Sequence, residues 1–198
     1  IMLDNSLYFA NKCQGHSLEK YNLKENDYFL TTVHRPQNTD NPERLSDIFY
    51  TLMAIADDEE CTLLLPLHPR TNKVLTESNP ELWNELLEHK RVNIIPPASF
   101  LEMIELESNA RFVVTDSGGV QKEAFFFKKP SLILRSETEW VEICDDNNAL
   151  LVDADPERIY AGVAWMKNEM NREFKPYFGD GKASEFICKE IISFLKNR

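Results

Sequence analysis

The sequence has 198 residues, of which 42% are hydrophobic and 28% charged, and its formal net charge is −11. These values fit one globular domain with a core of its own. Such an acidic surface repels nucleic acid and anionic lipid, and no apolar run approaches the roughly 20 residues of a membrane helix. We therefore expect neither a nucleic-acid partner nor a membrane.

The cysteines are widely separated, and no pair has the Cys-x-x-Cys spacing of a zinc site or redox motif. Free thiols in a reducing cytoplasm are the expectation, with no metal centre and no disulfide scaffold. Residues 1–12 contain no secretory signal, and because the chain begins at Ile1 and not at Met, we expect a fragment of a longer protein. The four cysteines are Cys13, Cys61, Cys144 and Cys188.

Short apolar runs alternate with helical patterns along the chain. The runs are rich in β-branched and aromatic residues, which is typical of strands covered on both faces, and the helical patterns carry apolar residues at helical spacing. In chain order we expect a strand at Tyr28–Val33, a helix at Asn41–Asp57, a strand at Thr62–Pro66, a helix at Val74–His89, a strand at Val92–Ile95, a helix at Phe100–Glu107, a strand at Phe112–Thr115, a helix at Val120–Phe127, strands at Ser131–Leu134 and Ala149–Val152, and helices at Pro156–Met170 and Lys182–Lys196.

This alternation predicts an α/β fold: a Rossmann-like, doubly wound parallel sheet with right-handed crossovers. Residues 1–173 form the expected domain. The segment Phe174–Gly181 is rich in Pro, Gly and aromatic residues, which indicates a linker. We expect residues 174–198 to be this linker and a last helix that packs back on the domain or on a missing part of the protein.

Four polar segments follow predicted strands. The carboxyl ends of parallel strands lie along one edge of the sheet, where ligands bind, so these segments should meet on one rim. They are His34-Arg35, His68 with Arg70, Asp116-Ser117-Gly118-Gly119, and Arg135-Ser136.

The Ser117-Gly118-Gly119 turn leads from a strand into a helix. Two glycines allow positive φ angles and close approach to a ligand, and the helix start offers free N–H groups, so the turn suits a phosphate. The alternative is a helix N-cap with glycines for tight packing. The turn matches neither a Walker sequence nor a Gly-x-Gly-x-x-Gly fingerprint, which disfavours ATP and NAD. Glu123 could accept hydrogen bonds from a ribose diol or could be a solvated helix carboxylate.

The other rim residues also allow two interpretations. His34 can move protons near neutral pH, Arg35 can grip a diphosphate, and Asn38 could touch a sugar hydroxyl or shape the loop. His68, followed by proline, suits either a structural role or ligand contact. Arg135 could neutralise a phosphate or pair with a nearby glutamate, Glu137 or Glu139.

The motifs along the chain resemble those of the non-hydrolysing UDP-N-acetylglucosamine 2-epimerase family. The resemblance covers nearly the whole chain and extends to a tail at Tyr177-Phe178-Gly179-Asp180-Gly181-Lys182-Ala183. In order, the other motifs are Thr32-Val33-His34-Arg35-Pro36-Gln37-Asn38, Pro66-Leu67-His68-Pro69, Thr115-Asp116-Ser117-Gly118-Gly119-Val120-Gln121-Lys122-Glu123-Ala124, and Lys129-Pro130 with Leu134-Arg135 and Thr138-Glu139.

The resemblance implies a two-domain enzyme of GT-B type, of which this chain matches the second half. Its reaction interconverts UDP-N-acetylglucosamine and UDP-N-acetylmannosamine by elimination and re-addition of UDP, with no metal or redox cofactor, in the cytoplasm. The partners implied are a UDP-sugar, the N-terminal half of the same enzyme and a second copy in a homodimer. The family's principal acid–base carboxylates lie in the first half, so we expect this chain alone to bind weakly and to turn over nothing.

Carried over residue by residue, the resemblance makes His34 catalytic. It makes Glu123 the ribose ligand and Arg135 a counter-charge to phosphate. The substrate-binding set is then Arg35, Asn38, His68, Ser117, Gly118, Gly119, Glu123 and Arg135, with Ser117, Gly118 and Gly119 on the diphosphate.

Several positions depart from the family's commonest pattern. They are Gln37, Arg70-Thr71, Trp140-Val141 and Met103, the last in the expected uracil loop Pro97–Met103. Two alternative functions share the architecture: the nucleotide-sugar half of a GT-B glycosyltransferase, and a non-catalytic nucleotide-sugar sensor.

Overall fold

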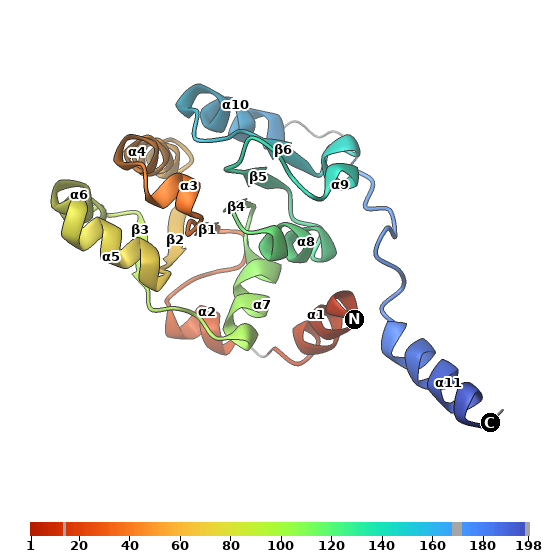
Figure 1. Ribbon diagram of the computed structural model, residues 1–198. Helices are drawn as coiled ribbons and strands as arrows, with labels where there is room; N and C mark the ends of the chain where they lie inside the picture. Colours follow the sequence, from red (N-terminus) through yellow and green to blue (C-terminus); the bar gives the residue numbers. More distant parts are fainter. Residues whose placement is uncertain (14, 168–171, 197–198) are drawn as a thin grey trace.

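The core of the protein is a parallel sheet. The structure, a computed structural model, describes residues 1–13, 15–167 and 172–196, and in these residues the sheet has six strands in the order β3-β2-β1-β4-β5-β6 (Figure 1). This order confirms the predicted Rossmann-like, doubly wound α/β fold. The strands are β1 (Tyr28–Thr32), β2 (Thr62–Pro66), β3 (Val92–Ile95), β4 (Val113–Thr115), β5 (Ser131–Ile133) and β6 (Ala149–Leu151).

Helices cover both faces of the sheet (Figure 1). Neighbouring residues of β1 point to opposite faces, so Phe29 joins one buried cluster while Tyr28 and Leu30 join another. The Phe29 cluster lies under α4 (Pro42–Asp58), α5 (Pro69–Ser78), α6 (Pro80–Glu88) and α10 (Pro156–Lys167). The opposite face carries α7 (Phe100–Asn109), α8 (Gly118–Phe126), α2 (His16–Lys20) and α9 (Val141–Asp145).

The expected single helix at Val74–His89 is wrong, because two helices occupy this region. The chain breaks between α5 and α6 at Asn79 and Pro80, where proline disfavours a helical conformation in the residue before it. The Asn79 side chain then accepts the N–H of Leu82 and caps α6. The other predicted helices agree with the structure to within a few residues, and residues 168–170 of the expected Pro156–Met170 helix lie outside the described ranges.

Among the residues that the structure describes, four short helices were not predicted. They are α1 (Met2–Ala10), α2, α3 (Pro36–Thr39) and α9. Of these, α1 packs against α7 and α8, and α3 is a single turn that follows β1.

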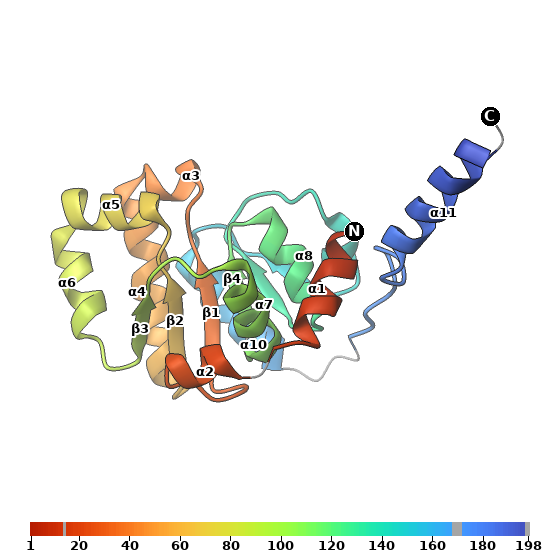
Figure 2. The ribbon, with the colours of Figure 1, turned by 90° about the horizontal axis from the view of Figure 1, so that it is seen from below.

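The C-terminal helix α11 (Ala183–Lys196) has no buried residue in the described part of the chain. It extends away from the sheet (Figure 2). The Asp4 carboxylate of α1 holds its first turn, by accepting hydrogen bonds from the backbone N–H and the hydroxyl of Ser184 at 2.8 and 2.9 Å. No helix in the described ranges has the length and apolar character needed to cross a membrane.

Candidate functional site

The sheet order reverses between β1 and β4, and the segments that follow these strands form the candidate site. The connections from β1 lead toward β2 and β3, and those from β4 lead toward β5 and β6. The hydroxyl groups of Thr32 and Thr115 meet across the two strands at 2.6 Å. A ligand crevice is expected at this point of a doubly wound sheet.

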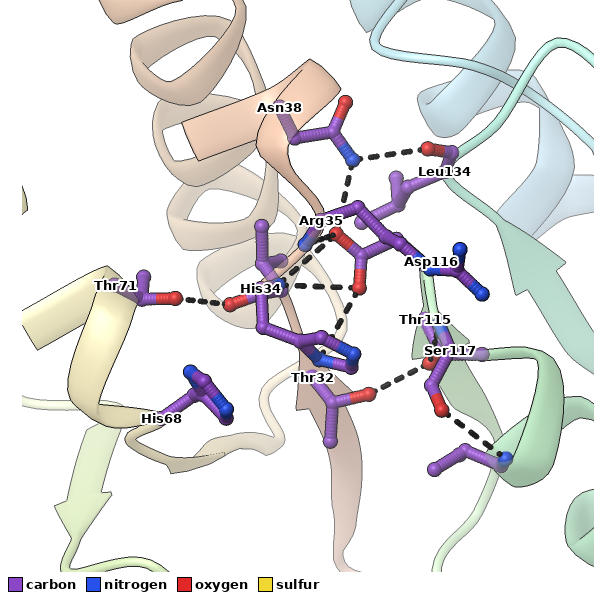
Figure 3. Close-up of polar contacts among 12 residues, drawn as sticks. Thr32, His34, Arg35, Asn38, His68, Thr71, Thr115, Asp116, Ser117 and Leu134 are labelled. Atoms are coloured by element: carbon purple, nitrogen blue, oxygen red, sulfur yellow. Dashed lines mark hydrogen bonds and ion pairs between the residues drawn. The ribbon is translucent and has the colours of Figure 1, made fainter. Parts of the chain in front are cut away.

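Asp116 organises the loop that follows β1 (Figure 3). Its fully buried carboxylate accepts the backbone N–H of His34 at 3.0 and 3.1 Å and that of Arg35 at 2.8 Å. It also accepts the Asn38 carboxamide N–H at 3.1 Å. A buried carboxylate is stable only when donors surround it, and here the donors fix the course of the loop.

Asn38 extends this network into the domain. Its side chain is 1% exposed, and its Nδ2 donates to Leu134 O at 3.0 Å as well as to Asp116. Its Oδ1 accepts from Arg44, which also pairs with Asp153 at 2.5 Å. These contacts make Asn38 a positioning residue of the loop, and its expected contact with a sugar stays a prediction.

The first turn of α8 supplies free N–H groups. Ser117 is the N-cap, and its hydroxyl accepts the Val120 N–H at 3.5 Å. Gly118 and Gly119 have helical φ angles, so the positive φ that glycine allows is used at neither position. As the first two residues of the helix, they have no acceptor for their N–H groups among the described residues. The predicted cap is therefore present, while the predicted anion site on the same turn stays a prediction.

Two arginines lie near this turn. Nη2 of Arg35 is 3.8 Å from the position that a Cβ on Gly118 would occupy. Arg135 donates two hydrogen bonds to Glu139, at 2.7 and 2.9 Å, so the pairing alternative for Arg135 is realised with Glu139. This contact raises the pKa of Arg135 and holds the pKa of Glu139 at about 2. A phosphate role for Arg135 stays a prediction.

His34 and His68 come together on the same rim. Their ring centroids are 5.0 Å apart, with planes inclined by 30°. Burial lowers the pKa of His34, and His68 and Arg35 add to this, while Asp116 acts in the opposite direction. The lowered pKa favours the neutral form of His34. His68 caps α5 by accepting the Arg70 N–H on Nδ1 at 3.1 Å.

Arg70, on α5, anchors the segment that follows β1. Its guanidinium donates to both Asp40 carboxylate oxygens at 2.6 Å and to the Thr39 hydroxyl at 2.8 Å.

Met103 of the expected uracil loop is half-buried and packs against the cluster that contains Tyr28.

Glu123 lies further along α8, away from the free N–H groups. It is half-buried, and burial raises its pKa, while the nearby Ser6 side chain acts in the opposite direction. Its neighbour Glu107 on α7 is fully buried, and neither of its carboxylate oxygens has a partner among the described residues. Burial, with Glu123 nearby, raises the pKa of Glu107 well above its ordinary value.

Sequence reasoning found the supporting residues of this site only in part. It placed Asp116 on the rim and offered Glu139 as one partner of Arg135, but it gave Asp116 no role in holding the loop after β1 and did not single out Arg44. Trp140 also lies here and donates from Nε1 to Gly118 O at 2.9 Å. The only available signal was the position of Asp116 directly after a predicted strand. In the described ranges, no group of three or more His, Cys, Asp or Glu side chains is placed to hold a metal ion.

Comparison with known proteins identifies relatives along almost the whole chain. A sequence model of the family described as UDP-N-acetylglucosamine 2-epimerase matches residues 1–192. A protein of that name from Methanocaldococcus jannaschii is 39% identical over 87% of this chain and 46% of its own length. UDP-2,3-diacetamido-2,3-dideoxy-D-glucuronate 2-epimerase from Pseudomonas aeruginosa is 36% identical over 96% of this chain and 51% of its own length.

A solved structure is similar as well. The crystal structure of the M. jannaschii UDP-GlcNAc 2-epimerase in complex with UDP-GlcNAc and UDP superposes with a TM-score of 0.86 at 35% identity. The match covers 97% of this chain and 53% of that one. The chain therefore spans about half the length of the relatives it matches.

Proposed function

Because the chain belongs to the UDP-N-acetylglucosamine 2-epimerase family, we propose that it is the C-terminal, UDP-binding half of an epimerase. The whole enzyme would interconvert UDP-N-acetylglucosamine and UDP-N-acetylmannosamine. The observation that carries this proposal is the start of α8, where the N–H groups of Gly118 and Gly119 are free beside Arg35. Free N–H groups, a helix dipole and a guanidinium together suit a diphosphate.

The sugar and ribose would lie on either side of the diphosphate. Glu123, at the second turn of α8, would accept hydrogen bonds from the ribose diol, and its half-buried position limits competition from water. His34 and His68 would face the sugar or the leaving UDP. Asn38 and Asp116 would act through the loop that they hold.

The proposed reaction removes the C2 proton to a base and breaks the bond between C1 and the UDP oxygen. UDP leaves with the bonding electrons, and a glycal remains. Addition of UDP to C1 and of a proton to the other face of C2 gives the epimer. This half would stabilise the departing UDP with preorganised N–H groups and cations, which accelerates the reaction if they bind the leaving charge better than the ground state.

The acid–base carboxylates would come from the first half, so the isolated chain would be inactive. Residues 1–173 would form the UDP-binding domain, and residues 174–198 would lead α11 onto that first half. In support, α11 buries none of its residues in this chain, and several of its apolar side chains are exposed. All four cysteines are free thiols, which fits a cytoplasmic enzyme.

Calorimetric titration of this chain with UDP tests the nucleotide site. We expect weak binding that Arg35→Ala reduces about tenfold, the effect of losing one charge-assisted contact. Lys90→Ala removes the same charge before β3, at the opposite edge of the sheet, and should leave the affinity unchanged. Equal binding by the wild type and Arg35→Ala would contradict the assignment.

Adding the first half in trans tests the activity. The mixture should exchange the C2 proton of UDP-N-acetylglucosamine with deuterium from D2O, and this chain alone should not. Exchange by this chain alone, or no exchange by a mixture that binds UDP, would refute the proposal. The same assay with UDP-2,3-diacetamido-2,3-dideoxy-D-glucuronate, the sugar named in the P. aeruginosa relative, tests the alternative substrate.

A further inference from the structure

The environment of His34 selects one of its two ring nitrogens for the proton. Nδ1 lies 3.4 Å from Oδ1 of Asp116, whose carboxylate already accepts two backbone N–H groups and the Asn38 amide. An ionised carboxylate can only accept hydrogen bonds. A neutral imidazole beside it is stable with the proton on Nδ1, which leaves Nε2 unprotonated.

The environment of His68 selects the opposite arrangement. Its Nδ1 accepts the backbone N–H of Arg70 at 3.1 Å and so caps the first turn of α5. A nitrogen that accepts a hydrogen bond carries no proton, so the proton of neutral His68 is on Nε2.

From these contacts we infer that His34 and His68 form a stacked pair of opposite tautomers, in which Nε2 of His34 is an acceptor and Nε2 of His68 is a donor. The rings lie face to face, with centroids 5.0 Å apart. Asp116 is the positioning residue for His34. The charged and titratable groups that face His34 are Asp116 from the end of β4, His68 from the start of α5, and the adjacent Arg35.

If the proposed function holds, this pair gives the nucleotide-sugar site one acceptor and one donor on the same rim. A sugar hydroxyl can donate to Nε2 of His34, while Nε2–H of His68 donates to a second oxygen of the ligand. His34 would then enter the reaction able to accept a proton, and it could donate from Nε2 only after accepting one. This assigns the two histidines different roles.

Long-range ¹H–¹⁵N NMR of the ¹⁵N-histidine-labelled, ligand-free chain at pH 8 tests the inference without any nucleotide. The chain has four histidines, and His34→Gln and His68→Gln variants assign the two signals. We expect the Nδ1–H tautomer for His34 and the Nε2–H tautomer for His68. His89 is an internal reference for Nε2–H, because its Nδ1 accepts the Arg91 N–H at 3.3 Å. An Nε2–H or averaged signal for His34, or an Nδ1–H signal for His68, would overturn the pair.

Asp116→Asn tests the positioning role. The Asn oxygen can keep the backbone N–H groups while its NH2 group faces Nδ1 of His34, so His34 should change to the Nε2–H tautomer and His68 should not. An unchanged His34 in a folded variant would refute the role of Asp116. If the amide spectrum shows that the variant is unfolded, a pH titration of the wild type tests the tautomer of His34. Of its two ring nitrogens, Nε2 should gain the proton as the pH falls, because Nδ1 already carries one. If the wild-type chain shows both expected tautomers but does not bind UDP, this result would count against the proposed function and not against the tautomer pair.

Discussion

Arg135 holds Glu139 through two parallel hydrogen bonds, at 2.7 and 2.9 Å. The Glu139 carboxylate is also 3.5 Å from the position that a Cβ on Gly118 would take. A negative charge therefore lies beside the proposed diphosphate site and neutralises one of its two arginines.

We predict that Glu139→Gln strengthens UDP binding, by about 3- to 10-fold, because removing a like charge beside a partly solvated anion gains on the order of 1 kcal/mol. Since the pKa of Glu139 is about 2, the gain should be constant from pH 5 to pH 8 in calorimetric titrations. Glu137→Gln, an exposed neighbour with the same charge change, is the control. Weaker binding by Glu139→Gln would mean that Glu139 serves to place Arg135.

The sheet and its rim could be predicted because buried parallel strands are short apolar runs that end in polar residues. Thus His34 and Ser117 could be placed on one edge before any coordinates. Pro80 was a local signal for the break after Asn79. The apolar spacing across Val74–His89 outweighed this signal and led to the prediction of one continuous helix. The environment of Asp116 had no such signal, since its donors come from residues about 80 positions earlier in the chain. The choice of Glu139 over Glu137 by Arg135 likewise depends on the path of a loop.

Two glycines separate effects on binding from effects on packing. A Cβ on Gly118 would meet its neighbours at 3.5–3.8 Å, which is ordinary contact. Gly118→Ala should therefore change the unfolding free energy by less than about 1 kcal/mol. Its methyl group would obstruct the approach to the free N–H groups, so UDP affinity should fall about tenfold, which is about 1.4 kcal/mol.

Gly162→Ala is the matched control, because its Cβ would be 2.7 Å from a methyl carbon of the buried Leu132. Overpacking of this kind costs about 1–3 kcal/mol of stability. Chemical denaturation should show this loss, while UDP binding by the folded protein stays unchanged. A stable Gly162→Ala variant, or a Gly118→Ala variant with full affinity, would contradict the corresponding prediction.

Two buried glutamates on α7 should give opposite pH dependences of stability. The pKa of Glu107 is raised by burial and by Glu123. In the unfolded chain this carboxyl loses its proton near pH 4.3, while in the folded protein it stays protonated to a higher pH. The free energy of unfolding therefore falls as the pH rises from the unfolded-state pKa to the folded-state pKa. Glu107→Gln should match the wild type at pH 4 and exceed it by about 1–3 kcal/mol at pH 8, since an unpaired buried acid is removed.

The pH dependence of stability due to Glu105 has the opposite sign. Burial raises its pKa, but hydrogen bonds from the backbone N–H groups of Ser17 and Gly15, at 2.8 and 2.5 Å, outweigh this and lower it. The stability it contributes is present above its unfolded pKa and is lost as the pH falls through the folded value. Glu105→Gln should therefore destabilise the protein at pH 7 and progressively less toward pH 4. Urea denaturation at several pH values measures both variants, and slopes of the same sign would contradict the assignment.

The exposed apolar residues of α11 should matter for binding the first half and not for the stability of this chain. Ile191 and Leu195 are 54% and 64% exposed and lie one turn apart. Ile191→Glu with Leu195→Glu should change the unfolding free energy by no more than about 0.5 kcal/mol, as expected for surface positions. The same pair should abolish association with the separately produced first half, because two charges would enter an apolar interface. Lys189→Gln with Lys196→Gln gives the same change in net charge on the other side of the helix and should leave association intact, as measured by calorimetry. Association that survives the glutamate pair would show that α11 does not contact the first half.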